Sequence, residues 1–173
     1  VYGGEFLEAL YGMLHGLTRL PVPVVAAVNG PAIGAGTQLA LASDLRVADD
    51  GARFGVPTAR NGMAVDAWTI RTLAAVAGGG MAGRLMLGAE IVDRDAALAC
   101  GLADRVGTLD DALAWAQEIA TLAPLALAHS KNVLRGADDT GVQRTFDACW
   151  ASEDVREALS ARSEKRAPVF HGR

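Results

Sequence analysis

The chain has 173 residues, of which 51% are hydrophobic and 21% charged, and its formal net charge is −4. This composition predicts a folded domain with a sizeable core and excludes a mainly disordered chain. The basic residues are scattered rather than gathered into a stripe, so we expect no nucleic-acid partner. No apolar run approaches the roughly 20 residues that cross a bilayer, and no signal segment is evident, so we expect no membrane span and a cytoplasmic location.

The first part of the chain alternates helices and strands. Apolar side chains at three- and four-residue spacing predict that it opens with a helix, which ends at two prolines. The predicted elements, in chain order, are a helix over 4–20, a strand over 22–30, a helix over 35–42, a strand over 45–48 and an extended piece over 54–57. A glycine-rich turn, GPAIGAG at 30–36, joins the first strand to the second helix.

Helices dominate the second part of the chain. The predicted ranges are 66–77, 80–88, 93–100, 108–123, 124–135 and 140–163. The run GGGMAG at 78–83 has the spacing of a dinucleotide-binding motif, but it follows a helix rather than a strand, so we interpret it as a helix break. The order of elements predicts an α/β fold with a core over 1–107 and a helical region over 108–173.

The cysteines and histidines do not indicate a metal site. Cys100 and Cys149 stand apart, which favours buried thiols in a reducing compartment over a disulfide. His15, His129 and His171 lack the short spacing of ligands that share one element. We therefore expect neither a metal nor a resident cofactor.

The turn around Gly34 and Ala35 is the first candidate site. Amides in the first turn of a helix have no partner within the helix, and the helix dipole favours negative charge beside them. The Ala35 amide is therefore placed to stabilise an oxygen that gains charge. On the residues alone, an ordinary glycine-mediated turn between strand and helix stays open as the alternative.

Three stretches carry a family resemblance: PVPVVAAVNGPAIGAGTQLALASDLRVADDGARFGVPTARNG at 21–62, LGAEIVDRDAALACGLADRV at 87–106 and EKRAPVFHGR at 164–173. They resemble the enoyl-CoA hydratase/isomerase (crotonase) superfamily. The resemblance implies a spiral of ββα turns with a helical trimerisation region, a coenzyme A thioester as ligand, and a homotrimer or dimer of trimers. It also implies that the family's N-terminal strands, which carry half of the usual site, are absent from this sequence.

The same resemblance assigns roles at the turn. In the superfamily, the amide at the Ala35 position forms half of an oxyanion hole. Hydratases add two carboxylates, one that activates water and one that delivers a proton. Those positions hold Gln38 and Thr58 here, and neither side chain exchanges a proton near pH 7. The resemblance therefore implies that the thioester is bound without efficient hydration.

Three further positions have two interpretations each. Asp66 matches the spacing of the nucleophile in the superfamily's 4-chlorobenzoyl-CoA dehalogenases, but aspartate at a helix start is also a common cap. Trp68 either walls an acyl pocket or fills the core. Lys165 matches a lysine that reaches the CoA phosphates, or it belongs to a solvated basic tail.

Three functions follow from these residues. The first is an acyl-CoA-binding protein of lipid metabolism, because the turn, VDAW at 65–68 and the tail look closest to a mycobacterial member that lacks both glutamates and binds fatty acyl-CoA for mycolate synthesis. The second is an isomerase, hydrolase or dehalogenase that uses Asp66. The third is a structural subunit with a vestigial site.

Overall fold

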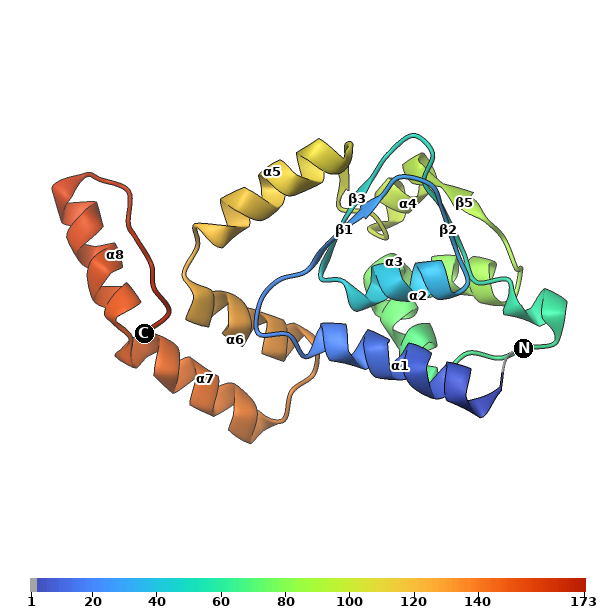
Figure 1. Cartoon of the computed structure of the whole chain (residues 1–173), viewed down its shortest axis with the longest axis horizontal. Coiled ribbons are helices and arrows are strands. Elements are labelled where there is room, and N and C mark those ends of the chain that lie inside the picture. Colours follow the sequence, from blue (N-terminus) through green and yellow to red (C-terminus); the bar gives the residue numbers. More distant parts are fainter. Residues whose placement is uncertain (1–2) are drawn as a thin grey trace. The chain divides into compact units, whose positions relative to one another are not determined.

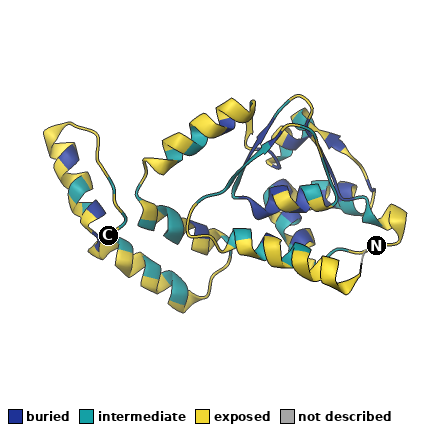
Figure 2. Ribbon diagram, viewed as in Figure 1, coloured by how far each residue is buried: buried dark blue, intermediate teal, exposed yellow. Residues whose placement is uncertain are grey.

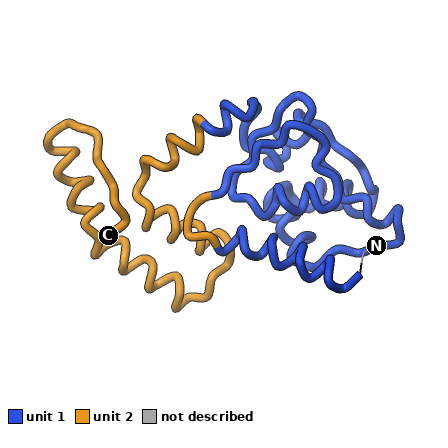
Figure 3. Tube along the Cα trace, viewed as in Figure 1, with its two compact units in different colours: residues 1–19, 24–113 blue, residues 20–23, 114–173 orange. Residues whose placement is uncertain are grey.

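The computed structural model describes residues 3–173 and separates into two compact units (Figure 3). Unit 1 contains the chain up to residue 19 and residues 24–113, and unit 2 contains residues 20–23 and 114–173. No helix within residues 3–173 combines the length and the apolar character needed to cross a membrane.

Most elements of unit 1 are labelled in Figure 1. Its elements are α1 Gly4–Thr18, β1 Val25–Val28, β2 Pro31–Ile33, α2 Ala35–Ala42, β3 Leu45–Ala48, β4 Arg53–Gly55, the 3-10 helix η1 Thr58–Asn61, α3 Ala67–Met86, β5 Val92–Asp93, α4 Arg94–Cys100 and β6 Arg105–Val106. The next helix, α5 Leu109–Ala120, begins in unit 1 and ends in unit 2. Unit 2 continues with α6 Pro124–Leu134, α7 Asp139–Ala151 and α8 Glu153–Glu164.

The strands of unit 1 form two small sheets. In the first sheet, β1, β3 and β6 are parallel neighbours. In the second, β4 pairs with β2 in parallel and with β5 in antiparallel orientation. Because the order β1–β2–α2 is followed by β3–β4–α3, each sheet gains one strand per repeat, which is a spiral of ββα turns. The predicted α/β fold is confirmed.

Three strands were missed by the sequence analysis: the two-residue strands β5 and β6, and residues 31–33, which it assigned to a turn. These residues form β2 and pair with β4, with Ala32 opposite Phe54. Three residues are too few to show the alternation that marks a strand, and the strand begins with a proline. The pairing depends on β4, which lies further along the chain.

The core of unit 1 is formed where α2, α3 and α4 pack against the strands, and it is dark blue in Figure 2. Its largest fully buried side chains include Leu41, Phe54, Leu73 and Leu85. Each such side chain contributes about 1.5–3 kcal/mol when it is removed from water. Buried alanines, among them Ala48 of β3, lie between the large residues.

A buried cation, Arg46 on β3, ties this strand to the segment after α4. Its Nε donates to the Leu102 carbonyl at 2.7 Å, and its Nη1 donates to the Ser43 carbonyl at 3.0 Å. Its Nη2 lies 3.1 Å from Oδ2 of Asp104, which also accepts the main-chain N–H of Arg46 at 2.7 Å. The charge is therefore buried together with the groups that compensate it.

The predicted break near residue 78 is confirmed. Residues 67–86 form one run, α3, but Gly78 within it has φ 79° and ψ 155°, which is not helical. Glycine adopts positive φ at little cost because it has no Cβ. The rest of GGGMAG is helical, so the run serves as a kink.

The single helix predicted over 140–163 is wrong. Two helices, α7 and α8, occupy this range, and Ser152 between them has the extended angles φ −70° and ψ 158°. Its hydroxyl donates to the Cys149 carbonyl at 2.7 Å. Serine followed by two acidic residues is a helix-start signal, which the apolar spacing of the flanking helices obscured.

The Arg46 cluster gives a stability prediction. Arg46→Ala should lower the free energy of unfolding by about 2–4 kcal/mol, because Asp104 and buried carbonyls lose their donors. Urea denaturation followed by circular dichroism measures the change. Arg71→Ala, at an exposed position on α3, is the matched control and should change stability by less than about 0.5 kcal/mol. Equal losses in both variants would contradict the role given to Arg46.

Candidate functional site

A buried hydroxyl holds the turn between β2 and α2. Gly34 has φ 60°, in the left-handed region, and its N–H donates to the Gly55 carbonyl at 2.8 Å. Thr37 is fully buried, and its Oγ1 accepts the Gly55 N–H at 3.0 Å. The same hydroxyl lies 2.5 Å from the Ala32 carbonyl, which accepts its proton. The start of α2 is therefore fixed to the ends of β2 and β4.

The first turn of α2 presents unpaired amides. No described group accepts a hydrogen bond from the N–H of Ala35, and no side chain caps the helix. Such amides carry partial positive charge at the end of the helix dipole. The Ala35 N–H is therefore available to an oxygen atom of a ligand.

A cavity of about 610 Å³ lies beside these amides and is called the α1–α2 cavity below. One wall is the apolar face of α1, and the others are the start of α2 and the segment 57–65. The α1 side chains that line it are Phe6, Leu7, Leu10 and Tyr11. None of the described residues in its lining is charged. The volume and the apolar walls are typical of a site for a small organic ligand.

Four residues singled out from the sequence lie together in this lining: Gly34, Ala35, Gln38 and Thr58. Gln38 is 3% exposed and lies one helical turn beyond Ala35. Thr58 begins η1, and its main-chain N–H donates to the Val56 carbonyl at 2.8 Å. The positions expected to face the reacting atoms therefore carry an amide and a hydroxyl.

A threonine that the sequence analysis missed connects Gln38 to Asp66. The Nε2 of Gln38 donates to Oγ1 of Thr69 at 2.9 Å, and the Thr69 hydroxyl donates to Oδ1 of Asp66 at 2.5 Å. Thr69 is fully buried. Its position three residues after Asp66 is the spacing of a helix cap and its partner, which could have drawn attention to it.

Asp66 caps α3. Its Oδ1 accepts the main-chain N–H of Thr69 at 3.3 Å, and its own N–H donates to the Tyr11 hydroxyl at 3.3 Å. Asp66 is half-buried and is not among the described residues that line the α1–α2 cavity. The capping interpretation is confirmed, and a catalytic role for Asp66 stays a prediction.

Trp68 is not among the described residues that line the cavity. It packs against the core of unit 1, and its ring meets that of His15 edge-on, with centroids 5.7 Å apart and planes at 71°. The Nε2 atom of His15 is buried and has no hydrogen-bond partner in the described chain. This position favours the core interpretation of Trp68, and contact with an acyl chain stays a prediction.

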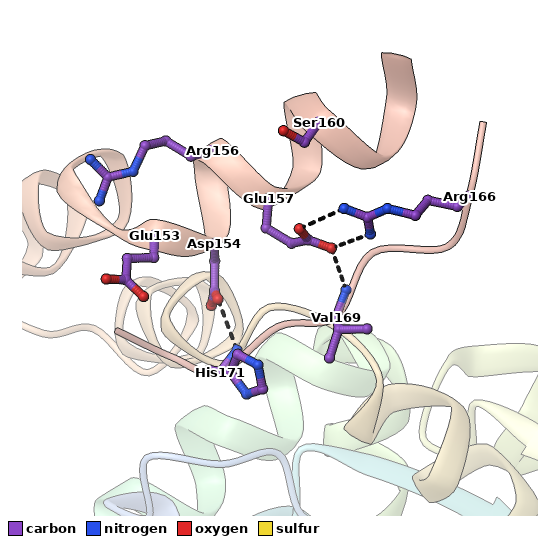
Figure 4. Close-up of a pocket in the computed structure, with 8 residues that line it drawn as sticks. All are labelled: Glu153, Asp154, Arg156, Glu157, Ser160, Arg166, Val169 and His171. Carbon is purple, nitrogen blue, oxygen red and sulfur yellow. Dashed lines mark hydrogen bonds and ion pairs between the residues drawn. The ribbon is translucent and has the colours of Figure 1, made fainter. Parts of the chain in front are cut away.

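In unit 2, the chain after α8 folds back along that helix (Figure 4). Asp154 is 4% exposed, and its two oxygens accept the main-chain N–H groups of His171 and Gly172 at 2.8 and 2.9 Å. A cavity of about 580 Å³, lined mainly by polar and charged side chains, lies along this segment. Asp154 therefore holds the tail through two main-chain N–H groups.

The tail begins at Lys165, and an ion pair reinforces it. Both carboxylate oxygens of Glu157 bind Arg166, at 2.5 and 2.9 Å. The Arg166 guanidinium and the Val169 N–H hold the pKa of Glu157 at about 2. Lys165 ends α8 with φ 55° and is exposed. Its predicted contact with CoA phosphates stays a prediction.

Comparison with known proteins gives one family. The enoyl-CoA hydratase/isomerase family model matches residues 4–173. The probable enoyl-CoA hydratase echA6 of Mycobacterium tuberculosis is 46% identical over 178 residues, which cover 99% of this chain and 72% of the relative.

Solved structures agree with the sequence match. The enoyl-CoA hydratase of Bacillus anthracis has a TM-score of 0.89 at 28% identity, and the match covers 98% of this chain and 70% of that one. An enoyl-CoA hydratase/carnithine racemase of Magnetospirillum magneticum has a TM-score of 0.83 at 31% identity, and the match covers 99% of this chain and 69% of that one. The chain therefore belongs to the enoyl-CoA hydratase/isomerase family, within the crotonase superfamily.

Proposed function

We propose that the protein binds fatty acyl-CoA thioesters in the α1–α2 cavity and does not hydrate them efficiently. The observation that carries this proposal is a cavity beside unpaired helix amides whose described lining holds no charged residue. The thioester oxygen accepts the Ala35 N–H, where the helix dipole stabilises its partial negative charge. The acyl chain lies against the apolar α1 wall, which removes both surfaces from water.

The described lining lacks the acid–base groups that hydration of an enoyl thioester needs. Adding water to an enoyl thioester needs one group that takes a proton from water and another that gives a proton to carbon. Gln38 and Thr58 have no proton to exchange near neutral pH, and the Gln38 amide is already bonded to Thr69. Each missing acid–base group typically lowers a rate by about 10²–10⁴.

The relatives support coenzyme A as the carrier of the acyl group, since those reported above are named enoyl-CoA hydratases. Lys165 is our candidate contact for the CoA phosphates, as an exposed cation on a tail that is otherwise fixed. Under this proposal the protein needs no cofactor, because coenzyme A is part of the ligand itself.

Unit 2 supports the proposal of a homotrimer or a dimer of trimers. Among the described residues of this unit, Ala161 is the only buried hydrophobic residue. Large apolar side chains are exposed on its helices, including Leu134, Trp150 and Leu159. Exposed apolar surface of this kind marks contact with another chain.

The first prediction under this proposal concerns activity. Hydration of crotonyl-CoA should be absent or about 10⁴-fold or more slower than in a family member that carries both glutamates, because neither proton transfer has a donor or acceptor. Loss of absorbance by the conjugated thioester measures the rate. Such a member, assayed in parallel, is the positive control. Turnover at ordinary enzyme rates would contradict the proposal.

A second prediction locates the acyl chain. Leu7→Ala should weaken dodecanoyl-CoA binding by about 1–2 kcal/mol and free CoA hardly at all, because apolar contact area is lost. Met13→Ala is the matched control, since Leu7 and Met13 lie on α1 at 42% and 47% exposure and only Leu7 lines the cavity. Calorimetric titration measures both. Equal weakening of dodecanoyl-CoA binding by the two variants would place the acyl chain outside this cavity.

A third prediction separates a cap from a nucleophile. Asp66→Asn should preserve the fold and the affinity for dodecanoyl-CoA, because asparagine caps a helix about as well as aspartate. Thermal unfolding and titration measure these properties. A screen of aryl- and enoyl-CoA thioesters in which the unmodified protein turns over a substrate and Asp66→Asn does not would make the protein an enzyme.

A further inference from the structure

The segment 57–65 forms one wall of the α1–α2 cavity and has little support of its own. Every residue from 59 to 64 is exposed, so this wall contributes no side chain to the core of unit 1. The Met63 N–H donates to the Thr58 carbonyl at 3.0 Å, which shapes the segment but does not attach it to a neighbour. A wall with so few buried contacts needs an attachment from outside to keep its distance from α1.

One side chain, Arg60, supplies that attachment. Its Nη2 donates to the Ala89 carbonyl at 2.8 Å, in the turn between α3 and β5. Apart from bonds within 57–65 and to Val56 just before it, this is the only hydrogen bond that links the segment to another part of residues 3–173. A charged donor makes a stronger hydrogen bond than a neutral one, so this contact is the main restraint on the wall.

The turn that receives Arg60 is itself firmly held. Ala89 is 7% exposed and has φ 51°, a left-handed conformation that residues with a Cβ rarely adopt. The Glu90 N–H donates to the Arg84 carbonyl at 3.1 Å, and a Cβ on Gly55 would lie 3.0 Å from the Glu90 carbonyl oxygen. Backbone in an uncommon conformation persists only where its surroundings determine it. The acceptor of the Arg60 bond therefore lies on fixed backbone.

We propose that Arg60 is the positioning residue of this wall and acts as a latch. While Arg60 is bonded to Ala89, the segment 57–65 stays against the acyl chain and slows its release. Without that bond the exposed segment moves away from α1, and the chain leaves sooner, because affinity in such sites is set mainly by the dissociation rate. This inference rests on the proposed binding of acyl-CoA and names the residue that controls how long the ligand stays.

The test compares the release of two ligands that differ in chain length. Dissociation of dodecanoyl-CoA and acetyl-CoA from the full chain is measured by surface plasmon resonance. Arg60→Gln should speed the release of dodecanoyl-CoA about three- to tenfold, as expected for one lost hydrogen bond. Release of acetyl-CoA should change less than about twofold, because a two-carbon chain has little apolar surface to place against the wall. An unchanged rate for dodecanoyl-CoA would overturn the inference. So would an equal rise for both ligands, which would place Arg60 at the CoA phosphates.

Two further variants separate the latch from a general effect of charge. Arg53→Gln is the matched control, because Arg53 is also exposed and donates to the Asp50 and Ala52 carbonyls at 3.1 and 2.7 Å, outside the described lining of the cavity. It should leave both rates unchanged. Arg60→Lys keeps one donor, and only one guanidinium nitrogen contacts Ala89, so release should return to within about twofold of the unmodified protein. Fast release in Arg53→Gln, or no rescue by lysine, would overturn the inference.

Hydrogen–deuterium exchange tests the latch without a ligand. Arg60→Gln should speed exchange in peptides that cover 57–65 and leave those of α2 and α3 unchanged, which also shows that the variant is folded. Unchanged exchange over 57–65 would overturn the inference. If dodecanoyl-CoA does not bind the unmodified protein, the proposed function fails and the control of release fails with it. If it binds and Arg60→Gln releases it no faster, only the latch fails.

Discussion

The buried hydroxyl of Thr37 is the interaction on which the site depends. It accepts the Gly55 N–H and donates toward the Ala32 carbonyl, so a single oxygen joins the neighbouring strands β2 and β4 to α2. Leaving the Gly55 N–H unpaired would cost about 1–3 kcal/mol. Space is restricted as well, because a Cβ on Gly55 would lie 3.0 Å from the Glu90 carbonyl oxygen. This junction fixes where the amides of α2 begin.

The two units are stabilised by different means. Unit 1 has a continuous apolar core, and its buried Arg46 is fully enclosed by partners from neighbouring segments. Unit 2 instead holds its tail through carboxylates: Asp154 binds main-chain N–H groups, and Glu157 binds both an arginine and an N–H. The binding surface proposed here lies in the unit with the rigid core, which suits a site whose geometry depends on distances between helices.

The sequence was informative where the signal is local and weak where it depends on packing. Spacing of apolar residues predicted α1, α2 and β3, and glycine chemistry predicted the kink at Gly78. The turn before α2 indicated Ala35, whereas Gln38 and Thr58 were indicated only by the family resemblance, which places the two hydratase carboxylates at those positions. Thr69 was missed because its contact with Gln38 joins residues 31 apart, on helices whose approach no local pattern specifies. Trp68 was ambiguous for the same reason.

The bridge from Gln38 through Thr69 to Asp66 also limits how the site can be altered during evolution or by engineering. Gln38→Glu alone would place a second carboxylate against the lone pairs of Thr69, and one hydroxyl proton cannot satisfy two acids. A neutral residue at the cap of α3 would remove this competition and leave the Thr69 proton to a glutamate at position 38. The two positions are therefore expected to show epistasis, although neither side chain bonds directly to the other.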